Sequence, residues 1–175
     1  MDIIGNIFGI IATIVFLSSY QLKKRKHIII CSAISRLLYA LQYIFLGAFS
    51  GLVLDLVAGV VSIVAEKKDS SFIKKRFPLV VALCYVLIIL SGAVAYEGIF
   101  TLIAVCGVIF EVSAFWVNSV FKIRMLSLLA PPCWCAYNIK FLAYGSAVGN
   151  VITFISIIVS IFRYHVFKKE NNLEK

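Results

Sequence analysis

The sequence predicts an all-α polytopic membrane protein with seven transmembrane helices, and three observations carry that prediction. First, 62% of the 175 residues are apolar and the mean hydropathy is +1.03, far above the range of soluble globular domains. Second, the apolar residues form long blocks, close to the roughly 20 residues that cross a bilayer, rather than the alternating pattern of a β-barrel. Third, charged residues fall mostly between these blocks.

The blocks place the seven expected spans in order along the chain. They are residues 3–22, 28–46, 52–65, 78–96, 99–117, 125–144 and 148–162. The third and seventh are short, and we expect each to extend by a turn at either end. So many spans leave almost no chain for loops, so the function is expected to lie within or at the membrane.

The distribution of Lys and Arg predicts the orientation. Fifteen of the seventeen basic residues follow the first, third, fifth or seventh span, whereas the opposite side carries only Glu97 and Asp2. Because Lys and Arg concentrate in cytoplasmic loops, we expect the N-terminus outside and the C-terminus in the cytoplasm. The net charge of +9 is then explained by topology and by attraction to anionic lipid, and it requires no nucleic-acid partner.

The longest polar interval, EKKDSSFIKKR at residues 66–76, divides the chain. It suggests a three-helix repeat at 1–66, a basic cytoplasmic loop and linker helix at 67–97, a second three-helix repeat at 98–167 and a polar cytoplasmic tail at 168–175. An offset of 95 residues aligns these pairs: Tyr39 with Trp134, Gln42 with Tyr137, Ala48 with Ala143, Ser50 with Gly145 and Asp55 with Asn150. Since one helix separates two odd-numbered triplets, both repeats point the same way, a 3+1+3 plan known from transporters.

Two ionisable side chains lie inside predicted spans at a similar depth. Arg36 is near the centre of the second span and Glu111 is about two-thirds along the fifth, both roughly 10 Å inside the cytoplasmic boundary at ~1.5 Å per residue. Because an unpaired charge is expensive in hydrocarbon, we expect them to pair across the two repeats. Either a structural ion pair or a cytoplasmic-side gate fits this pattern.

Asp55 and Lys140 form a second candidate pair, in the outer halves of the third and sixth spans. Lys140 is also close enough to the outer end to extend its ammonium group into the interface. Asp55 lies deeper, and Asn150 lies at the equivalent depth in the seventh span. Two such polar groups facing a central axis favour a small-solute binding site.

Pro131 and Pro132 remove two backbone donors from the sixth span and predict a kink. The freed carbonyls are tolerated at this depth only where protein or a watery cavity satisfies them. With Trp134, Tyr137 and Asn138 close by, the prolines fit either a cavity-facing hinge or ordinary helix packing.

No metal site, cofactor or enzymatic activity is predicted. The five cysteines fall inside spans as small packing residues, and no nucleophile–base set or phosphate-binding loop occurs. Gly5 and Gly9 form a Gly-x-x-x-Gly motif in the first span, which leaves a homo-oligomer open.

Two runs of residues resemble a known family. They are RMLSLLAPPCWCAYNIKFLAYGSAVGNVITFISIIVSIFRY at 124–164 and FLSSYQLKKRK at 16–26. With the length and span count, they resemble the YgjV-type bacterial inner-membrane proteins over nearly the whole chain. This resemblance implies a multi-pass protein of the bacterial inner membrane and no particular activity.

More distantly, the arrangement resembles the SWEET and PQ-loop transporters, which have two parallel three-helix repeats and a linker helix. In SWEETs a Trp-x-x-Tyr in helix six precedes a sugar-contacting Asn in helix seven, and Trp134, Tyr137 and Asn150 stand in that order here. The chain departs from the family at Asp55, where those transporters have Asn, and at Ser19-Tyr20-Gln21, where they have Pro-Gln. A carboxylate at the site would favour a cationic or proton-coupled solute over a sugar.

We therefore expect a carrier of a small polar solute that works by alternating access between the repeats, with the lipid bilayer as its other partner. Arg36 and Glu111 would form the gate, and Pro131 and Pro132 the hinge. The candidate substrate-binding residues are Tyr39, Gln42, Asp55, Trp134, Tyr137, Asn138 and Asn150. The alternative is a non-transporting membrane receptor or assembly protein.

Overall fold

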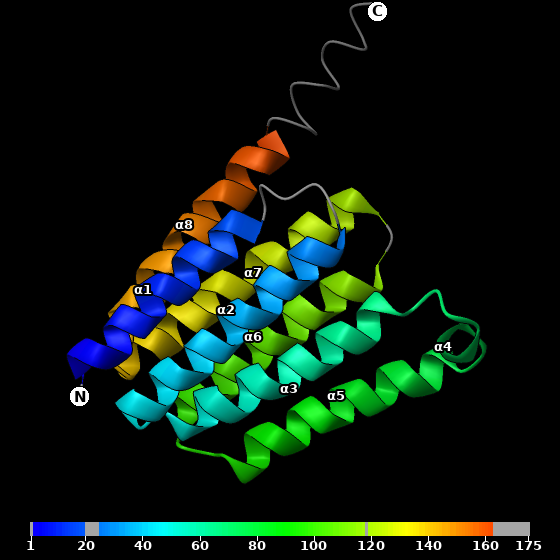
Figure 1. The fold of residues 1–175 in the computed structure, drawn as a ribbon. Helices are drawn as coiled ribbons and strands as arrows, with labels where there is room; N and C mark the ends of the chain where they lie inside the picture. Colours follow the sequence, from blue (N-terminus) through cyan, green and yellow to red (C-terminus); the bar gives the residue numbers. More distant parts are fainter. Residues whose placement is uncertain (1, 20–24, 118, 163–175) are drawn as a thin grey trace, which may run out of the picture.

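A computed structural model describes residues 2–19, 25–117 and 119–162 of the chain, which form eight α-helices and no strand (Figure 1). All but one of these helices have at least 18 residues, and α4 is a five-residue helix in the predicted basic loop. The helices are α1 Asp2–Ser19, α2 Arg25–Leu46, α3 Phe49–Glu66, α4 Ser71–Lys75, α5 Phe77–Val94, α6 Ile99–Trp116, α7 Val120–Lys140 and α8 Tyr144–Ile161.

Four of the described helices, α3, α5, α6 and α8, are long and apolar enough to cross a membrane. In α1 and α2 the apolar stretches are shorter, at Ile3–Ser18 and Ile34–Leu46. α7 carries Lys122 and Arg124 near its start and Lys140 at its end. The predicted all-helical fold is therefore confirmed, with four clear membrane-span candidates.

The α2–α3 and α7–α8 turns have the same backbone structure. Gly47 (φ +68°), directly after α2, and Leu142 (φ +57°), which follows the C-cap Phe141 of α7, each occupy the left-handed region. The next residue in each turn donates its N–H back to a helix carbonyl, Ala48 to Tyr43 at 3.0 Å and Ala143 to Asn138 at 2.8 Å. These are Schellman turns, and their equivalent positions differ by 95 residues.

The two turns also explain where the following helices begin. α3 starts at Phe49 and α8 at Tyr144, about one turn earlier than the apolar blocks at 52 and 148. Their first turns contain Ser50, Gly51, Gly145 and Ser146, which have little hydropathy of their own. The expected extension of the third and seventh segments is thus present at their N-terminal ends.

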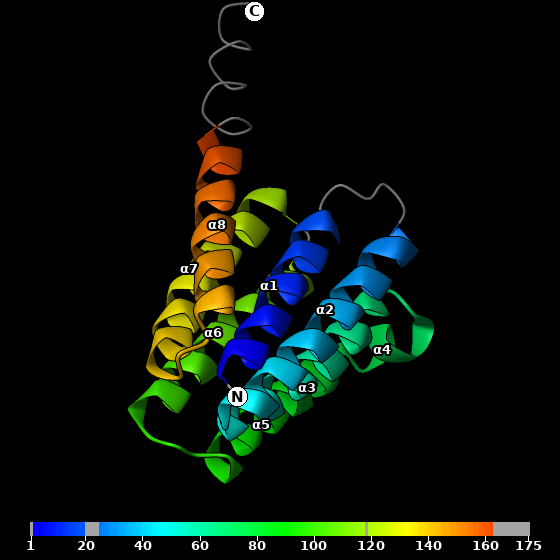
Figure 2. The ribbon, with the colours of Figure 1, turned by 60° about the vertical axis from the view of Figure 1, so that its left-hand side comes forward.

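The long helices other than α5 form a closed ring in which α1, α2, α3, α6, α7 and α8 pack in that order and α8 returns to α1. α5 lies outside the ring against α3 and α6, at the far side from α1 and α8 (Figures 1 and 2). Exchanging α1, α2 and α3 with α6, α7 and α8 leaves this order of contacts unchanged. Each group of three helices therefore has the same neighbours, and α5 alone breaks the equivalence.

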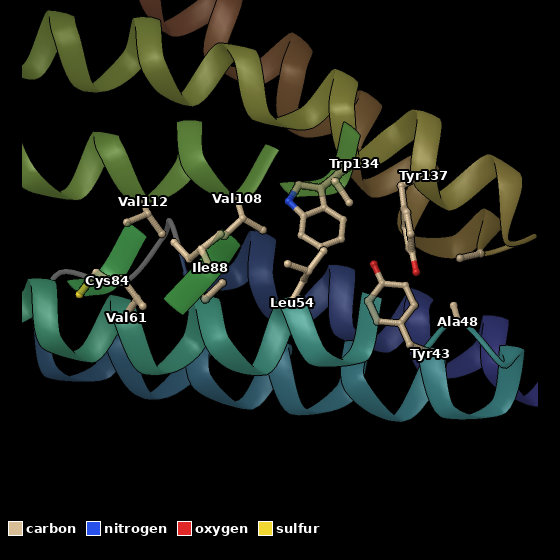
Figure 3. Packing of buried hydrophobic residues seen from close by; sticks show 13 residues of the cluster. Tyr43, Ala48, Leu54, Val61, Cys84, Ile88, Val108, Val112, Trp134 and Tyr137 are labelled. Carbon is tan, nitrogen blue, oxygen red and sulfur yellow. The ribbon is translucent and has the colours of Figure 1, made fainter. Parts of the chain in front are cut away.

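The apolar core lies on the α5 side of the ring. Leu54 and Val61 of α3 and Ile88 of α5 pack with Val108 and Val112 of α6, each at most 1% exposed (Figure 3). The aromatic rings of Tyr43, Trp134 and Tyr137 lie toward one end of this cluster. On the outer faces of the long helices many large apolar side chains are exposed, the surface expected of helices in contact with lipid.

Basic side chains gather at one end of the bundle. The α3–α5 connection, which contains α4, lies at the same end as the start of α7, whereas the α2–α3, α5–α6 and α7–α8 turns lie at the other (Figure 1). The basic residues of the first end are Lys67, Lys68, Lys74, Lys75, Arg76, Lys122 and Arg124. Residues 20–24 and 163–175, which carry further predicted cytoplasmic bases, lie outside the described residues.

Candidate functional site

A cavity of about 70 Å³ lies inside the ring, and every ring helix contributes to its wall. A space of this size admits several water molecules or part of a small solute. The lining residues are Phe16 of α1, Ser35, Arg36, Tyr39 and Tyr43 of α2, Asp55 of α3, Glu111 of α6, Trp134 and Asn138 of α7, and Ser146, Gly149, Asn150 and Thr153 of α8.

Arg36 bridges two carboxylates in this wall. Its Nη1 donates to Asp55 Oδ1 at 2.7 Å and its Nη2 to Glu111 Oε1 at 2.5 Å. The side chains are 12%, 8% and 23% exposed, so the cluster is largely removed from solvent. Arg36 and Glu111 thus meet as the sequence indicated, and Asp55 joins them from a neighbouring helix.

The expected pairing of Asp55 with Lys140 is wrong. Lys140 is exposed at the end of α7, and Asp55 binds Arg36. Asp55 meets Arg36 because the two residues lie at similar depth in neighbouring helices. Arg36 precedes Gly47 of the α2–α3 turn by eleven residues, and Asp55 follows it by eight. At ~1.5 Å per residue both stand about 12–16 Å from that turn. The predicted gate and the predicted binding site are therefore one cluster.

The cluster has more acceptors than the arginine uses. Arg36 donates to one oxygen of each carboxylate, and Asp55 Oδ2 is buried without a hydrogen-bond partner among the described residues. Arg36 Nε is likewise buried and unpaired there. One guanidinium against two carboxylates leaves a formal charge of −1 when all three are ionised, which favours a cation or a proton in the cavity.

Aromatic rings form another part of the wall. Tyr43 and Trp134 are nearly parallel, with ring centroids 6.4 Å apart and an interplanar angle of 16°. Tyr43 also donates its hydroxyl to Asn138 Oδ1 at 2.9 Å. Tyr43 and Asn138 are equivalent under the 95-residue offset, so equivalent positions of α2 and α7 meet each other inside the ring.

Further lining residues are related by the same offset. Besides Tyr43 with Asn138, the pairs are Phe16 with Glu111, Tyr39 with Trp134 and Asp55 with Asn150. The Tyr39 hydroxyl is bonded to Thr13 Oγ1 at 3.0 Å, whereas the Asn150 amide has no hydrogen-bond partner among the described residues. The cavity wall therefore contains five of the predicted binding residues, namely Tyr39, Asp55, Trp134, Asn138 and Asn150.

The structure places Tyr137 outside the cavity wall. Its hydroxyl accepts the Gly51 N–H at 2.6 Å and contacts Ser50 Oγ at 2.8 Å, both in the first turn of α3. A Cβ on Gly51 would lie 2.7 Å from this hydroxyl, so only glycine permits the contact. Tyr137 thus links α7 to the start of α3, and its role in substrate binding stays a prediction.

Gln42, the equivalent of Tyr137 under the 95-residue offset, connects α2 to the start of α8. It accepts a hydrogen bond from the Ser146 hydroxyl in the first turn of α8. Its amide also fills the space in front of Gly9, where an added Cβ would overlap with it. Gln42 thus links α2 to the start of α8 and is not among the residues that line the cavity, and its binding role stays a prediction.

The Gly-x-x-x-Gly motif of α1 is occupied within the chain. Gly5 packs against Leu46 and Gly9 against Gln42, both on α2. These glycines therefore serve the α1–α2 contact and give no support to a homo-oligomer.

Around its two prolines α7 remains one helix. Pro131 is buried and Pro132 exposed, and the helix runs uninterrupted from Val120 to Lys140. Gly107 of α6 packs against this segment, where a Cβ would lie 3.0 Å from Cys133 Cβ. The bend and the hinge role of the prolines stay predictions.

Two capping side chains escaped the sequence analysis. Glu97 accepts the Ser50 N–H at 2.7 Å and the Phe49 N–H at 3.3 Å at the start of α3. Asn6 of α1 accepts the Gly145 N–H and donates to the Leu142 carbonyl, both at 3.1 Å. In both cases the sequence feature that could have indicated a cap is a single polar residue near the end of an apolar block.

Comparison with known proteins gives one match. A family model, Imp-YgjV, described as a bacterial inner membrane protein, matches residues 3–168. No curated protein and no solved structure matches, so the expected similarity to SWEET and PQ-loop transporters is not shown. Within the described residues no group of three or more His, Cys, Asp and Glu side chains is arranged to hold a metal ion.

Proposed function

Because the chain belongs to the Imp-YgjV family of bacterial inner membrane proteins, we propose that it is a multi-pass carrier of a small polar solute. The observation that supports this function is the charged cavity lined by residues of all six ring helices. Charged side chains in the interior of a membrane bundle are expensive, and they commonly mark the path of a solute or ion.

The proposed topology has seven spans, α1, α2, α3, α5, α6, α7 and α8, with the N-terminus outside and the C-terminus in the cytoplasm. Residues 1–66 and 98–167 form parallel repeats, 67–97 hold the basic loop and the linker helix α5, and 168–175 form a cytoplasmic tail. The paired Schellman turns, the equivalent helix contacts and the single basic end support this plan.

Alternating access would arise from rocking of the two repeats about the cavity. The Arg36–Asp55 bond joins neighbouring helices of one repeat, whereas the Arg36–Glu111 bond joins the two repeats. A movement that opens the ring must therefore break or shift the Arg36–Glu111 bond. This bond is the proposed gate.

The test is the accessibility of the cavity from each side of the membrane. Single cysteines are placed at Asn150 and Ser35 in a cysteine-free background and labelled in oriented vesicles with a membrane-impermeant maleimide. A carrier exposes the same position in turn to both sides, so labelling from either side is expected. Val108→Cys, in the apolar core between α3, α5 and α6, is the matched control and should remain unlabelled.

Labelling of the cavity from one side only, or from neither, would contradict the carrier. It would support the alternative, a non-transporting receptor or assembly protein whose charges only hold the helices in register. Because the measurement requires no knowledge of the solute, a negative uptake screen cannot be mistaken for a failure of the proposal.

A further inference from the structure

The cavity carries an unbalanced buried charge. Asp55 is 6% exposed and its Oδ2 has no hydrogen-bond partner in the described part of the chain. Arg36 already donates Nη1 to Asp55 and Nη2 to Glu111. A buried carboxylate oxygen without a donor is unfavourable, and a ligand that brings both an N–H donor and a positive charge would satisfy it.

The remaining wall suits the body of such a ligand. Phe16, Tyr39, Tyr43 and Trp134 place four aromatic rings around the same small space. Aromatic faces attract cations, most strongly where water is excluded. A sugar site would instead need several directional donors and acceptors. Here the Tyr39 and Tyr43 hydroxyls are already bonded to Thr13 and Asn138.

We propose, resting on the carrier function above, that the cavity binds a small primary ammonium ion, with Asp55 Oδ2 accepting its N–H and Tyr43 and Trp134 covering its alkyl part. Asn150, the equivalent of Asp55 in the other group of helices, lines the same cavity. It offers a second polar contact to the same ligand.

In the absence of the amine, a proton on the carboxylate pair restores the balance. Binding then exchanges one proton for one ammonium ion, so the formal charge of the site is zero before and after. The charged or titratable groups that face Asp55 are Arg36, Tyr39 and Tyr43 of α2 and Glu111 of α6. From α1, α7 and α8 the described lining residues are uncharged, and α5, which packs on the other side of α3, contributes none to the cavity.

The experiment compares ethanolamine with ethylene glycol, a neutral diol of the same length, by titration calorimetry on the full-length protein in nanodiscs. We expect ethanolamine to bind at least about tenfold more tightly, since one charge pair at ~4 Å is worth more than that at an intermediate dielectric. We also expect its affinity to fall at least about threefold from pH 8 to pH 6, because protons compete for the site.

Asp55→Asn should remove both the preference for ethanolamine and its pH dependence. Asp69→Asn, which removes the same charge from the exposed α3–α4 connection, is the matched control and should retain both. Equal affinities for the two compounds in the wild-type protein would overturn the inference, and so would a pH-independent affinity. Both comparisons stand even if Asp55→Asn does not fold.

A tighter binding of Na⁺ than of ethanolamine would also overturn the inference, because it would assign the charge to a metal cation. None of these outcomes would contradict the proposed carrier function. If the cavity cysteines are labelled from both sides while ethanolamine is not preferred, the chain transports another class of solute. If they are not, the proposed function fails first.

Discussion

The α3–α6 contact and the α1–α8 contact close the same ring of helices, yet their chemistry differs. Between α3 and α6 the buried residues include Leu54, Ala58 and Val108, and α5 covers this contact from outside. Between α1 and α8 the backbones approach directly. A Cβ on Gly145 would lie 2.8 Å from the Asn6 carbonyl oxygen, and one on Gly149 would lie 2.5 Å from Thr13 Oγ1.

The charges follow the same division. Arg36, Asp55 and Glu111 belong to α2, α3 and α6 and surround the α3–α6 contact. At the equivalent positions 95 residues away, Pro131, Asn150 and Phe16 are uncharged. Two groups of helices with equivalent neighbours thus differ in charge at three cavity-facing positions.

This difference predicts which contact would move in the proposed carrier. Separating α3 from α6 would expose large apolar side chains and displace α5, at about 25 cal/mol per Å² of apolar surface. The α1–α8 contact relies on close packing of small residues, and α5, which packs on α3 and α6, does not cover it. We therefore expect the α1–α8 contact to separate by the larger distance when the repeats rock, and the α3–α6 contact to move only as far as the shift of the Arg36–Glu111 bond requires.

The largest effect is expected from Arg36→Met, which tests the charged side of the comparison. Two buried carboxylates would lose their common partner, and breaking a buried ion pair in this way costs about 3–5 kcal/mol. The measurement is the free energy of unfolding in detergent micelles. Lys140→Met, which removes an exposed base from the end of α7, is the control and should change it little.

Removing all three charges together sharpens this test. A variant with Arg36→Met, Asp55→Asn and Glu111→Gln no longer holds an uncompensated charge, so most of the lost stability should return. A triple variant as unstable as Arg36→Met alone would show that the loss comes from packing rather than from charge.

An intermediate effect is expected from Gly145→Ala on the neutral side. The new methyl group would meet backbone atoms of Asn6 and Ile10 at 2.8 and 2.9 Å, and backbone cannot yield as a side chain can. Overpacking of this kind costs about 1–3 kcal/mol, again in the unfolding free energy. Gly59→Ala is the matched control, because its nearest neighbour is Arg36 Cδ at 3.4 Å. Equal losses in the two variants would contradict a close α1–α8 contact.

The sequence predicted the helices and one cross-helix contact because hydropathy and depth carry that information. Arg36 and Glu111 lie at similar depth, and they meet. Asp55 was assigned to Lys140 because depth was counted from the ends of the apolar blocks, and the blocks did not reveal that α3 begins at Phe49. Small or polar residues in a first helical turn leave no mark in a hydropathy profile.

Helix rotation was the other limit. Trp134 and Asn138 are four residues apart and face the cavity together, whereas Tyr137, one position away, points to the start of α3. One residue corresponds to about 100° of rotation, so the choice between neighbours depends on which helix lies opposite. That neighbour is a tertiary fact, and neither composition nor the 95-residue offset contains it.

The smallest effect is expected from Glu97→Gln at the start of α3. The carboxylate accepts two backbone N–H groups there, and it also faces the positive end of the helix dipole. Gln retains an acceptor oxygen and loses the charge, so the unfolding free energy should fall by about 0.5–1 kcal/mol.

The equivalent cap at the start of α8 is the neutral Asn6, which makes Asn6→Asp the complementary variant. A carboxylate there would gain the helix-dipole interaction and lose the amide donor that holds the Leu142 carbonyl at 3.1 Å. These effects oppose each other, so Asn6→Asp should change stability less than Glu97→Gln does. A larger loss from Asn6→Asp would mean that the donor to the α7–α8 turn, rather than the cap itself, holds the α1–α8 side together.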